Sequence, residues 1–173
     1  MKYLIISASL NPNSRSRVMG SIAEKNFKNK GEVVEFLDIK NIELPYCDGD
    51  DCYNNPNVKL INKKIKNADC ILICSPIYNY DLNSVIKNIL ELSCRAWENK
   101  KVGFICAAGG YSSYMSPMSF MNSLMLDYRC LIIPRYVYAT GKDFDGISLI
   151  NSDIKDRIQD LVENAINITA KLA

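Results

Sequence analysis

The fold is decided by the stretch 70-CILICSPIYNY-80. Its first six residues, Cys70–Ser75, form the most uniformly apolar run of the chain, as expected of a strand at the centre of a parallel sheet that is covered on both faces. Cys70 and Cys74 stand four residues apart, so in a strand they point to the same face, where we expect them to pack as small apolar side chains. The following residues, Pro76–Asp81, predict a loop.

Short apolar runs alternate with amphipathic stretches along the whole chain. Further strands are predicted at residues 2–6, 33–39, 101–107 and 129–139, the last bent near Pro134, which cannot donate to a strand ladder. Helices are predicted at 15–28, 58–66, 82–97, 115–126 and 153–172. Five strands interleaved with five helices predict an α/β fold: a doubly wound, five-stranded parallel sheet with helices on both faces, in a single domain spanning residues 1–173.

Composition limits the classes of function. The chain has 173 residues, 48% of them hydrophobic, 23% charged residues and a net charge of +2. This is enough for one sizeable core, and the charge balance gives no reason to expect a nucleic-acid partner. No apolar run approaches the ~20 residues that cross a bilayer, and the apolar start is too short for a secretion signal. We therefore expect a cytoplasmic protein without a membrane partner.

The sequence contains no histidine. This removes the commonest general base, the Ser-His and Cys-His nucleophile systems and most transition-metal sites, so no metal site is expected. A redox cofactor suits such a chain, because the cofactor itself carries the difficult step.

Ligands of doubly wound sheets bind beyond the carboxyl ends of the strands. The first loop there reads 7-SASLNPNSRSR-17, with four serines and two arginines before a helix start. Free backbone N–H groups and the positive helix end favour an anion, and a hydroxyl-rich loop without the usual glycines suits a terminal monophosphate better than a pyrophosphate. Ordinary capping of the helix by Ser14 or Asn13 is the alternative.

Two further loops reach the same edge of the sheet. The stretch 75-SPIYNY-80 offers an apolar wall and backbone donors to a flat aromatic cofactor, or else it is a turn capped by Asn79. Gly109 and Gly110 allow a ligand ring to approach the backbone closely, or else they form a tight turn. The convergence of three such loops favours a cofactor site.

Together these pieces resemble the NADPH-dependent FMN reductase family and its flavodoxin-like quinone and azo reductase relatives. The matching pieces are Ser9 with 14-SRS-16, 76-PIYN-79 with 87-KN-88, Gly109-Gly110, and 133-IPRYVY-138. The resemblance implies a flavodoxin-like fold, bound FMN and NAD(P)H as co-substrate. It also implies an oxidoreductase with a ping-pong reaction, in which hydride passes to FMN and then to a small-molecule flavin, quinone or azo acceptor.

The resemblance also implies roles for individual residues. The FMN phosphate would be held by Ser9, Asn11, Ser14, Arg15 and Ser16. The isoalloxazine would be lined by Pro76, Ile77, Tyr78 and Asn79 and approached at its other edge by Gly109, Gly110 and Tyr111. No catalytic side chain is implied, although Tyr78 and Tyr111 would line the reacting ring. Arg15 or Arg17 would meet an adenosine phosphate of NADPH.

The chain departs from the family pattern at several positions. Many members carry glycine-serine and an arginine in the first loop, where this chain has Ala8-Ser9 and Asn11, so FMN affinity is expected to be lower. Some relatives have a small residue where this chain has Tyr80, which would restrict access over the flavin or stack in the substrate pocket.

Other interpretations remain open at this point. A flavodoxin-like electron carrier without NAD(P)H turnover is disfavoured because such carriers are usually strongly acidic; a flavin-free protein on the same fold is a third possibility. Family resemblance implies a homodimer or homotetramer, with an interface on residues 85–97 or 115–125, unless both segments are buried within the monomer. Cys47 and Cys52 are too few for a four-cysteine iron–sulfur cluster and are expected to be free thiols.

Overall fold

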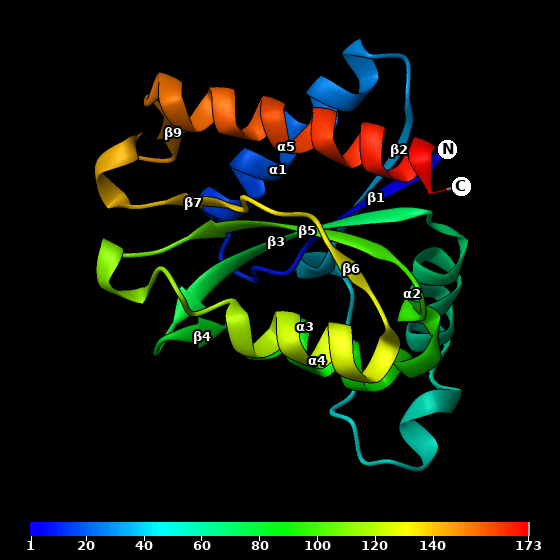
Figure 1. The fold of residues 1–173 in the computed structure, drawn as a ribbon. Helices are drawn as coiled ribbons and strands as arrows, with labels where there is room; N and C mark the ends of the chain where they lie inside the picture. Colours follow the sequence, from blue (N-terminus) through cyan, green and yellow to red (C-terminus); the bar gives the residue numbers. More distant parts are fainter. Residues whose placement is uncertain (173) are drawn as a thin grey trace.

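The computed structural model describes residues 1–172, which form a central parallel sheet covered by helices on both faces (Figure 1). The strands lie in the order β2-β1-β3-β5, followed by a fifth position that β6 and β7 share. Their bounds are β1 Lys2–Ser7, β2 Val33–Asp38, β3 Cys70–Tyr78, β5 Lys101–Ala107, β6 Leu131–Ile132 and β7 Val137–Ala139. This confirms the predicted flavodoxin-like, doubly wound sheet.

Five α-helices cover the sheet in two layers (Figure 1). Helices α1 (Arg15–Asn29) and α5 (Ser152–Lys171) lie on one face, and α2 (Pro56–Asn67), α3 (Ser84–Ser93) and α4 (Met118–Tyr128) lie on the other. Serine or asparagine caps the amino ends of α1, α2, α3 and α5, as these side chains commonly do. The 3-10 turns are η1 Ile39–Asn41, η2 Asp51–Asn54, η3 Cys94–Trp97, η4 Tyr111–Ser113 and η5 Gly141–Asp143.

The apolar core consists of one layer on each side of β3. Ile71 and Ile73 pack toward α2, α3 and α4, whereas Cys70, Leu72 and Cys74 pack toward α1 and α5. The strand is buried on both faces as predicted, and its two cysteines share one face as apolar side chains. No helix in the described part of the chain is both long and apolar enough to cross a bilayer.

The predicted fifth strand is interrupted at the position of the expected bend. Leu131 pairs with Lys101, but Val137 pairs with Ile105, so two extra residues are inserted between β6 and β7. Pro134 has no N–H to donate, and the following Arg135 takes a left-handed conformation with a φ of 60°. The interruption shifts the register but keeps both pieces beside β5.

Two hairpins add to this framework where the sequence predicted loops or no element. Strand β3 runs through Pro76 to Tyr78 and turns back into β4 (Asp81–Leu82), because Asn79 and Tyr80 both adopt the left-handed conformation of a tight two-residue turn. Strands β8 (Phe144–Asp145) and β9 (Ser148–Leu149) form the second hairpin, before α5.

Candidate functional site

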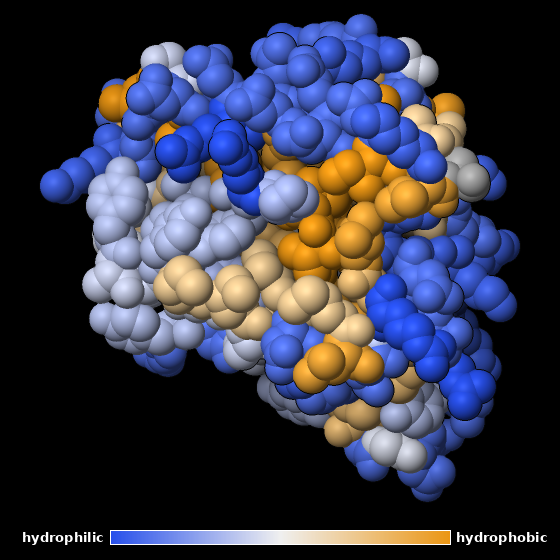
Figure 2. Space-filling view, in the orientation of Figure 1, coloured by the Kyte–Doolittle hydropathy of each residue, from blue (hydrophilic) through white to orange (hydrophobic). Residues whose placement is uncertain are grey.

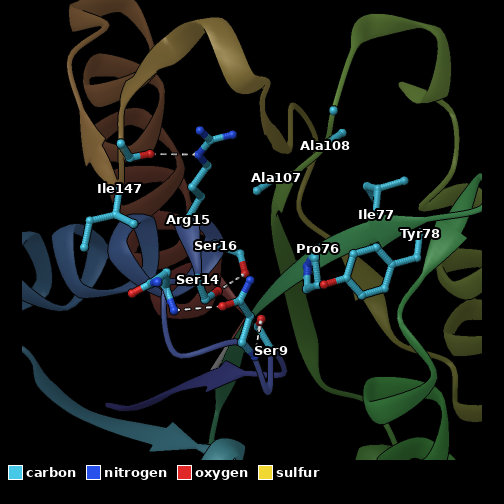
Figure 3. A pocket seen from close by; sticks show the side chains of 14 residues that line it. Ser9, Ser14, Arg15, Ser16, Pro76, Ile77, Tyr78, Ala107, Ala108 and Ile147 are labelled. Carbon is cyan, nitrogen blue, oxygen red and sulfur yellow. Dashed lines mark hydrogen bonds between the residues drawn. The ribbon is translucent and has the colours of Figure 1, made fainter.

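A cleft of about 350 Å³ lies beyond the carboxyl ends of β1, β3 and β5 (Figure 3). The structure brings nine of the twelve predicted cofactor residues to it. Those nine are Ser9, Asn11, Ser14, Arg15, Ser16, Pro76, Ile77, Tyr78 and Gly109; the remaining lining residues are Asn13, Ala107, Ala108, Gly146 and Ile147.

Hydroxyl groups gather at the amino end of α1. Ser14 caps the helix by accepting a 3.2 Å hydrogen bond from the Arg17 N–H, and its hydroxyl lies 3.0 Å from that of Ser16. Capping leaves the N–H groups of Arg15 and Ser16 without a protein acceptor within residues 1–172. Because the first turn contains no acidic residue, the positive end of the helix is uncompensated and favours an anion in the cleft.

The Arg17 side chain stabilises the first loop through contacts with its backbone. Its Nη1 donates a 2.7 Å hydrogen bond to the Asn11 carbonyl, Nη2 donates to the Ser9 carbonyl, and Nε lies 2.8 Å from a carboxylate oxygen of Asp38. The Arg17 side chain is therefore occupied by the loop and by Asp38, whereas Arg15 or Arg17 was expected to meet the adenosine phosphate of NADPH. Asn11 in turn accepts a 2.9 Å hydrogen bond from the Asn13 N–H.

Arg15 joins the first loop to the β8–β9 hairpin. Its Nε donates a 3.1 Å hydrogen bond to the Gly146 carbonyl, and its guanidinium carbon stands 5.2 Å from the centroid of the Phe144 ring. Gly146 and Ile147 thereby form a wall of the cleft that the sequence analysis did not identify. Gly146, which takes a positive φ at the first of the two turn residues between β8 and β9, is the hairpin signal that would have located this wall.

Asp143 fixes the segment that carries the hairpin. Its buried carboxylate accepts hydrogen bonds of 2.6 Å from the Thr140 N–H and 2.7 Å from the Asn151 amide. Burial alone would raise the pKa of this carboxyl, but the hydrogen bonds from Thr140 and Asn151 outweigh burial and lower the pKa below its ordinary value.

Acidification should therefore weaken this wall. The stabilisation from Asp143 is fully present above the unfolded-state pKa of roughly 3.9 and is lost as the pH falls through the lower folded-state pKa. We expect Asp143→Asn to lower the free energy of unfolding by about 1 to 3 kcal/mol at pH 7 and to flatten its decline below pH 5. Urea unfolding between pH 7 and pH 3 measures both effects, with the exposed Asp145→Asn as control. Parallel pH profiles for wild type and Asp143→Asn would contradict this role.

The second and third loops supply an apolar slot. Pro76, Ile77 and Tyr78 form one side, and the small residues Ala107 and Ala108 lie on the other (Figure 3). Tyr78 is about half exposed. Ala107 and Ala108 could have been predicted as lining residues, because they stand directly before Gly109 at the end of a buried strand.

The two glycines leave room in front of the backbone. A Cβ at Gly109 or Gly110 would meet no protein atom within 4 Å, and neither residue has a positive φ. The packing and backbone of the protein therefore require glycine at neither position. The open space lies where a planar ligand would approach the backbone of this loop.

Three predicted residues lie outside the cleft. Asn79 lines a neighbouring hollow with Lys87 and Ser119. The Gly110 carbonyl accepts a 2.8 Å hydrogen bond from the Tyr138 hydroxyl, and Tyr111 is 61% exposed at the start of η4. These residues border the cleft without lining it.

Cys47 and Cys52 lie in the segment between β2 and α2. The Cys47 sulfur stands 3.6 Å from the Tyr53 hydroxyl, and the Cys52 N–H donates to Asp48. All seven cysteines are free, and no group of three or more potential metal ligands occurs among residues 1–172. Neither residue lines the cleft.

Comparison with known proteins gives a consistent family. Residues 1–145 match the family model described as NADPH-dependent FMN reductase. The chain is 26% identical over 139 residues to an NAD(P)H-dependent FAD/FMN reductase of Geobacillus thermodenitrificans, covering 78% of this chain and 75% of that protein. It is 26% identical over 165 residues to an NADPH azoreductase of a Bacillus species, covering 94% and 89%. Plant quinone oxidoreductases match at 26 to 28% identity.

Solved structures agree on the fold. The flavoenzyme FerB of Paracoccus denitrificans, an NAD(P)H:(acceptor) oxidoreductase, superposes with a TM-score of 0.79 at 18% identity. The alignment covers 98% of this chain and 97% of that one.

Proposed function

The chain belongs to the NADPH-dependent FMN reductase family, and from this we propose that its cleft binds FMN and that the protein reduces small flavin, quinone or azo acceptors with NAD(P)H. Bound FMN would supply the redox chemistry, that is, the capacity to accept hydride from the nicotinamide and to donate electrons to an acceptor. The flavodoxin-like carrier is disfavoured, because the relatives matched over most of the chain are reductases.

The observation that carries this proposal is the donor set at the amino end of α1. Two free N–H groups, the hydroxyls of Ser14 and Ser16 and the Arg15 guanidinium converge on one end of the cleft. Arg15 is the only charged residue among the lining residues. Such a set suits a doubly charged terminal phosphate, which is the anionic end of FMN.

The rest of the cleft fits the remainder of the cofactor. In our proposal the isoalloxazine lies in the slot between Pro76–Tyr78 and Ala107–Gly109, where one side is apolar and the other carries only the small alanine methyl groups and a glycine beside a planar ring. The protein orients the ring and excludes water from it, which is the contribution that hydride transfer needs. Asn79, Gly110 and Tyr111 would border the ring at its open edge.

Anaerobic stopped-flow absorbance tests the function directly. The FMN-reconstituted protein is mixed with NADPH or NADH, and the oxidised flavin band is followed. We expect rapid bleaching and then recovery on adding a quinone, an azo dye or free flavin, with the apoprotein as control. If neither nucleotide reduces the bound FMN, the reductase function is contradicted and a flavodoxin-like electron carrier is favoured.

We further propose that the protein is a homo-oligomer, in its simplest form a homodimer. Figure 2 shows apolar side chains gathered over β6 and α4 on one face. The exposed apolar side chains of this region are Met115, Met118, Met125, Leu126 and Leu131. The other candidate, residues 85–97, directs most of its apolar side chains into the core. An exposed patch of this kind favours a two-fold contact with a second copy.

Leu126, which is 77% exposed, provides the test. Leu126→Glu should convert the dimer to a monomer in sedimentation equilibrium, because the interface would bury two unpaired charges. Leu60→Glu, which changes an exposed leucine of α2, should leave the mass unchanged. A wild-type protein that sediments as a monomer would contradict the proposal. We also propose a cytoplasmic location, supported by the seven free cysteines.

A further inference from the structure

Tyr80 occupies an unusual position at the tip of the β3–β4 hairpin. Its φ is 63° and that of the preceding Asn79 is 50°. The tight turn between twisted strands demands this left-handed conformation, which glycine and asparagine normally adopt and which is strained for a bulky side chain. The turn holds the Tyr80 side chain at the outer end of one wall of the cleft.

The Tyr80 hydroxyl reaches the opposite wall. It donates a 3.3 Å hydrogen bond to the Ser112 hydroxyl in η4, 32 residues along the chain. Tyr80 follows the lining residues Ile77 and Tyr78, and Ser112 follows the lining residue Gly109. In Figure 1 the β3–β4 hairpin and the turn after β5 lie at the same end of the sheet. The bond therefore ties the two walls together just beyond the slot.

A second cavity lies behind the same hairpin. This hollow of about 470 Å³ shares Tyr78 with the cleft and is lined otherwise by Asn79 of the turn and by residues of the β4–α3 segment and α4, including Asp81, Lys87 and Phe120. The hairpin that carries Tyr80 thus separates the slot from a hollow large enough for a small aromatic molecule.

The bond between Tyr80 and Ser112 is suited to opening and closing. Both side chains are exposed, Tyr80 by 68%, so water competes for both hydroxyls. Rotation of the tyrosine side chain would break the bond without disturbing the core. A ligand can therefore break the Tyr80–Ser112 hydrogen bond at a small cost in free energy.

We propose that Tyr80, held by Ser112, is a gate that selects electron acceptors by shape. With the gate closed, a flat aromatic molecule fits between the walls, whereas a branched or non-planar one has to break the Tyr80–Ser112 bond. The inference rests on the proposed function in that it places the flavin ring between residues 76–78 and 107–109.

Ligand binding to the FMN-loaded protein tests the gate without any turnover. The shift of the flavin absorption band gives the Kd of anthraquinone-2-sulfonate and of its tert-butyl-substituted analogue, with no NAD(P)H present. Tyr80→Ala should tighten binding of the bulky analogue about tenfold relative to the flat parent. Tyr80→Phe and Ser112→Ala should each give a smaller change in the same direction, and the double variant should add nothing further because both remove one bond. Tyr46→Ala, at an exposed tyrosine outside the cleft, is the control.

An unchanged ratio of the two Kd values in Tyr80→Ala would overturn the gate. If both ligands also bind more weakly by the same factor, Tyr80 is a stacking surface instead. A failure of the proposed function gives a different result. The titration needs bound FMN but no reductant. If Tyr80→Ala changes the Kd ratio but NAD(P)H does not reduce the bound flavin, the gate is supported and the reductase function is contradicted.

Discussion

Asn83→Ala is expected to lower the free energy of unfolding by about 2 to 4 kcal/mol and to weaken FMN binding at least tenfold. Asn83 is buried and caps α3, and its side chain joins two of the three loops of the cleft. Its Nδ2 donates a 2.8 Å hydrogen bond to the Ala8 carbonyl, and its Oδ1 lies 3.1 Å from the Ser75 hydroxyl. Alanine removes the side-chain donor of the buried Ala8 carbonyl and the link from the first loop to Ser75, and leaves the Ala8 N–H bond to the Cys74 carbonyl as the backbone contact between that loop and β3.

Two further variants separate positioning from stability. Asn83→Ser keeps a capping side chain for α3 but is too short to reach Ala8, so stability should partly recover while FMN affinity stays low. Asn88→Ala removes a second asparagine of α3, which bonds Pro45 and Cys47 away from the cleft, and should cost stability without changing FMN affinity. Urea unfolding and FMN fluorescence titration measure both quantities. Wild-type FMN affinity in Asn83→Ala would show that the loops need no such link.

Arg15→Ala is expected to weaken FMN binding about thirtyfold, which corresponds to about 2 kcal/mol for a charge-assisted hydrogen bond to phosphate. The guanidinium is already oriented by Gly146 and Phe144, so little rotational freedom remains to be lost on binding. Arg15→Lys keeps the charge but not this geometry and should give an intermediate loss.

Comparison of FMN with riboflavin isolates the phosphate. Wild type should prefer FMN, and Arg15→Ala should lose most of that preference while its riboflavin affinity stays the same. The FMN affinity of the variant should also depend less on salt concentration. Arg157→Ala, at an exposed arginine of α5, serves as control. If Arg15→Ala keeps the full preference for FMN over riboflavin, the FMN phosphate does not bind at this end of the cleft.

Local signals explain why much of the fold was predictable from the sequence. The buried strand at residues 70–75, the apolar faces of the helices and the position of Pro134 each depend on residues close in the chain. Helix ends were less exact. The predicted helix 82–97 is α3 followed by a 3-10 turn, because Cys94 takes a positive φ that ends the helix.

The site was predictable only in part, because only some of its features depend on residues that are close in the chain. Loops that follow parallel strands meet at one edge, so the position of the loops that carry Ser9, Ser14 and Pro76 followed from topology, and the choice of these residues followed from the family resemblance. The use of Arg17 as a brace, the link through Asn83 and the wall at Gly146 did not, because each depends on a partner that the local sequence does not specify.

The sequence by itself therefore determined the order of strands and helices and the loops that carry the candidate site, since hydrophobic periodicity and turn chemistry act over a few residues. Only the tertiary structure decided which side chains remain free for a ligand. Arg15 and Arg17 stand two positions apart in the first turn of α1, yet Arg17 is occupied by the backbone of the preceding loop and by Asp38, whereas Arg15 extends into the cleft toward Gly146. The physical reason is that an arginine contacts whatever the folded chain brings within reach, and Gly146 is 131 residues away in sequence.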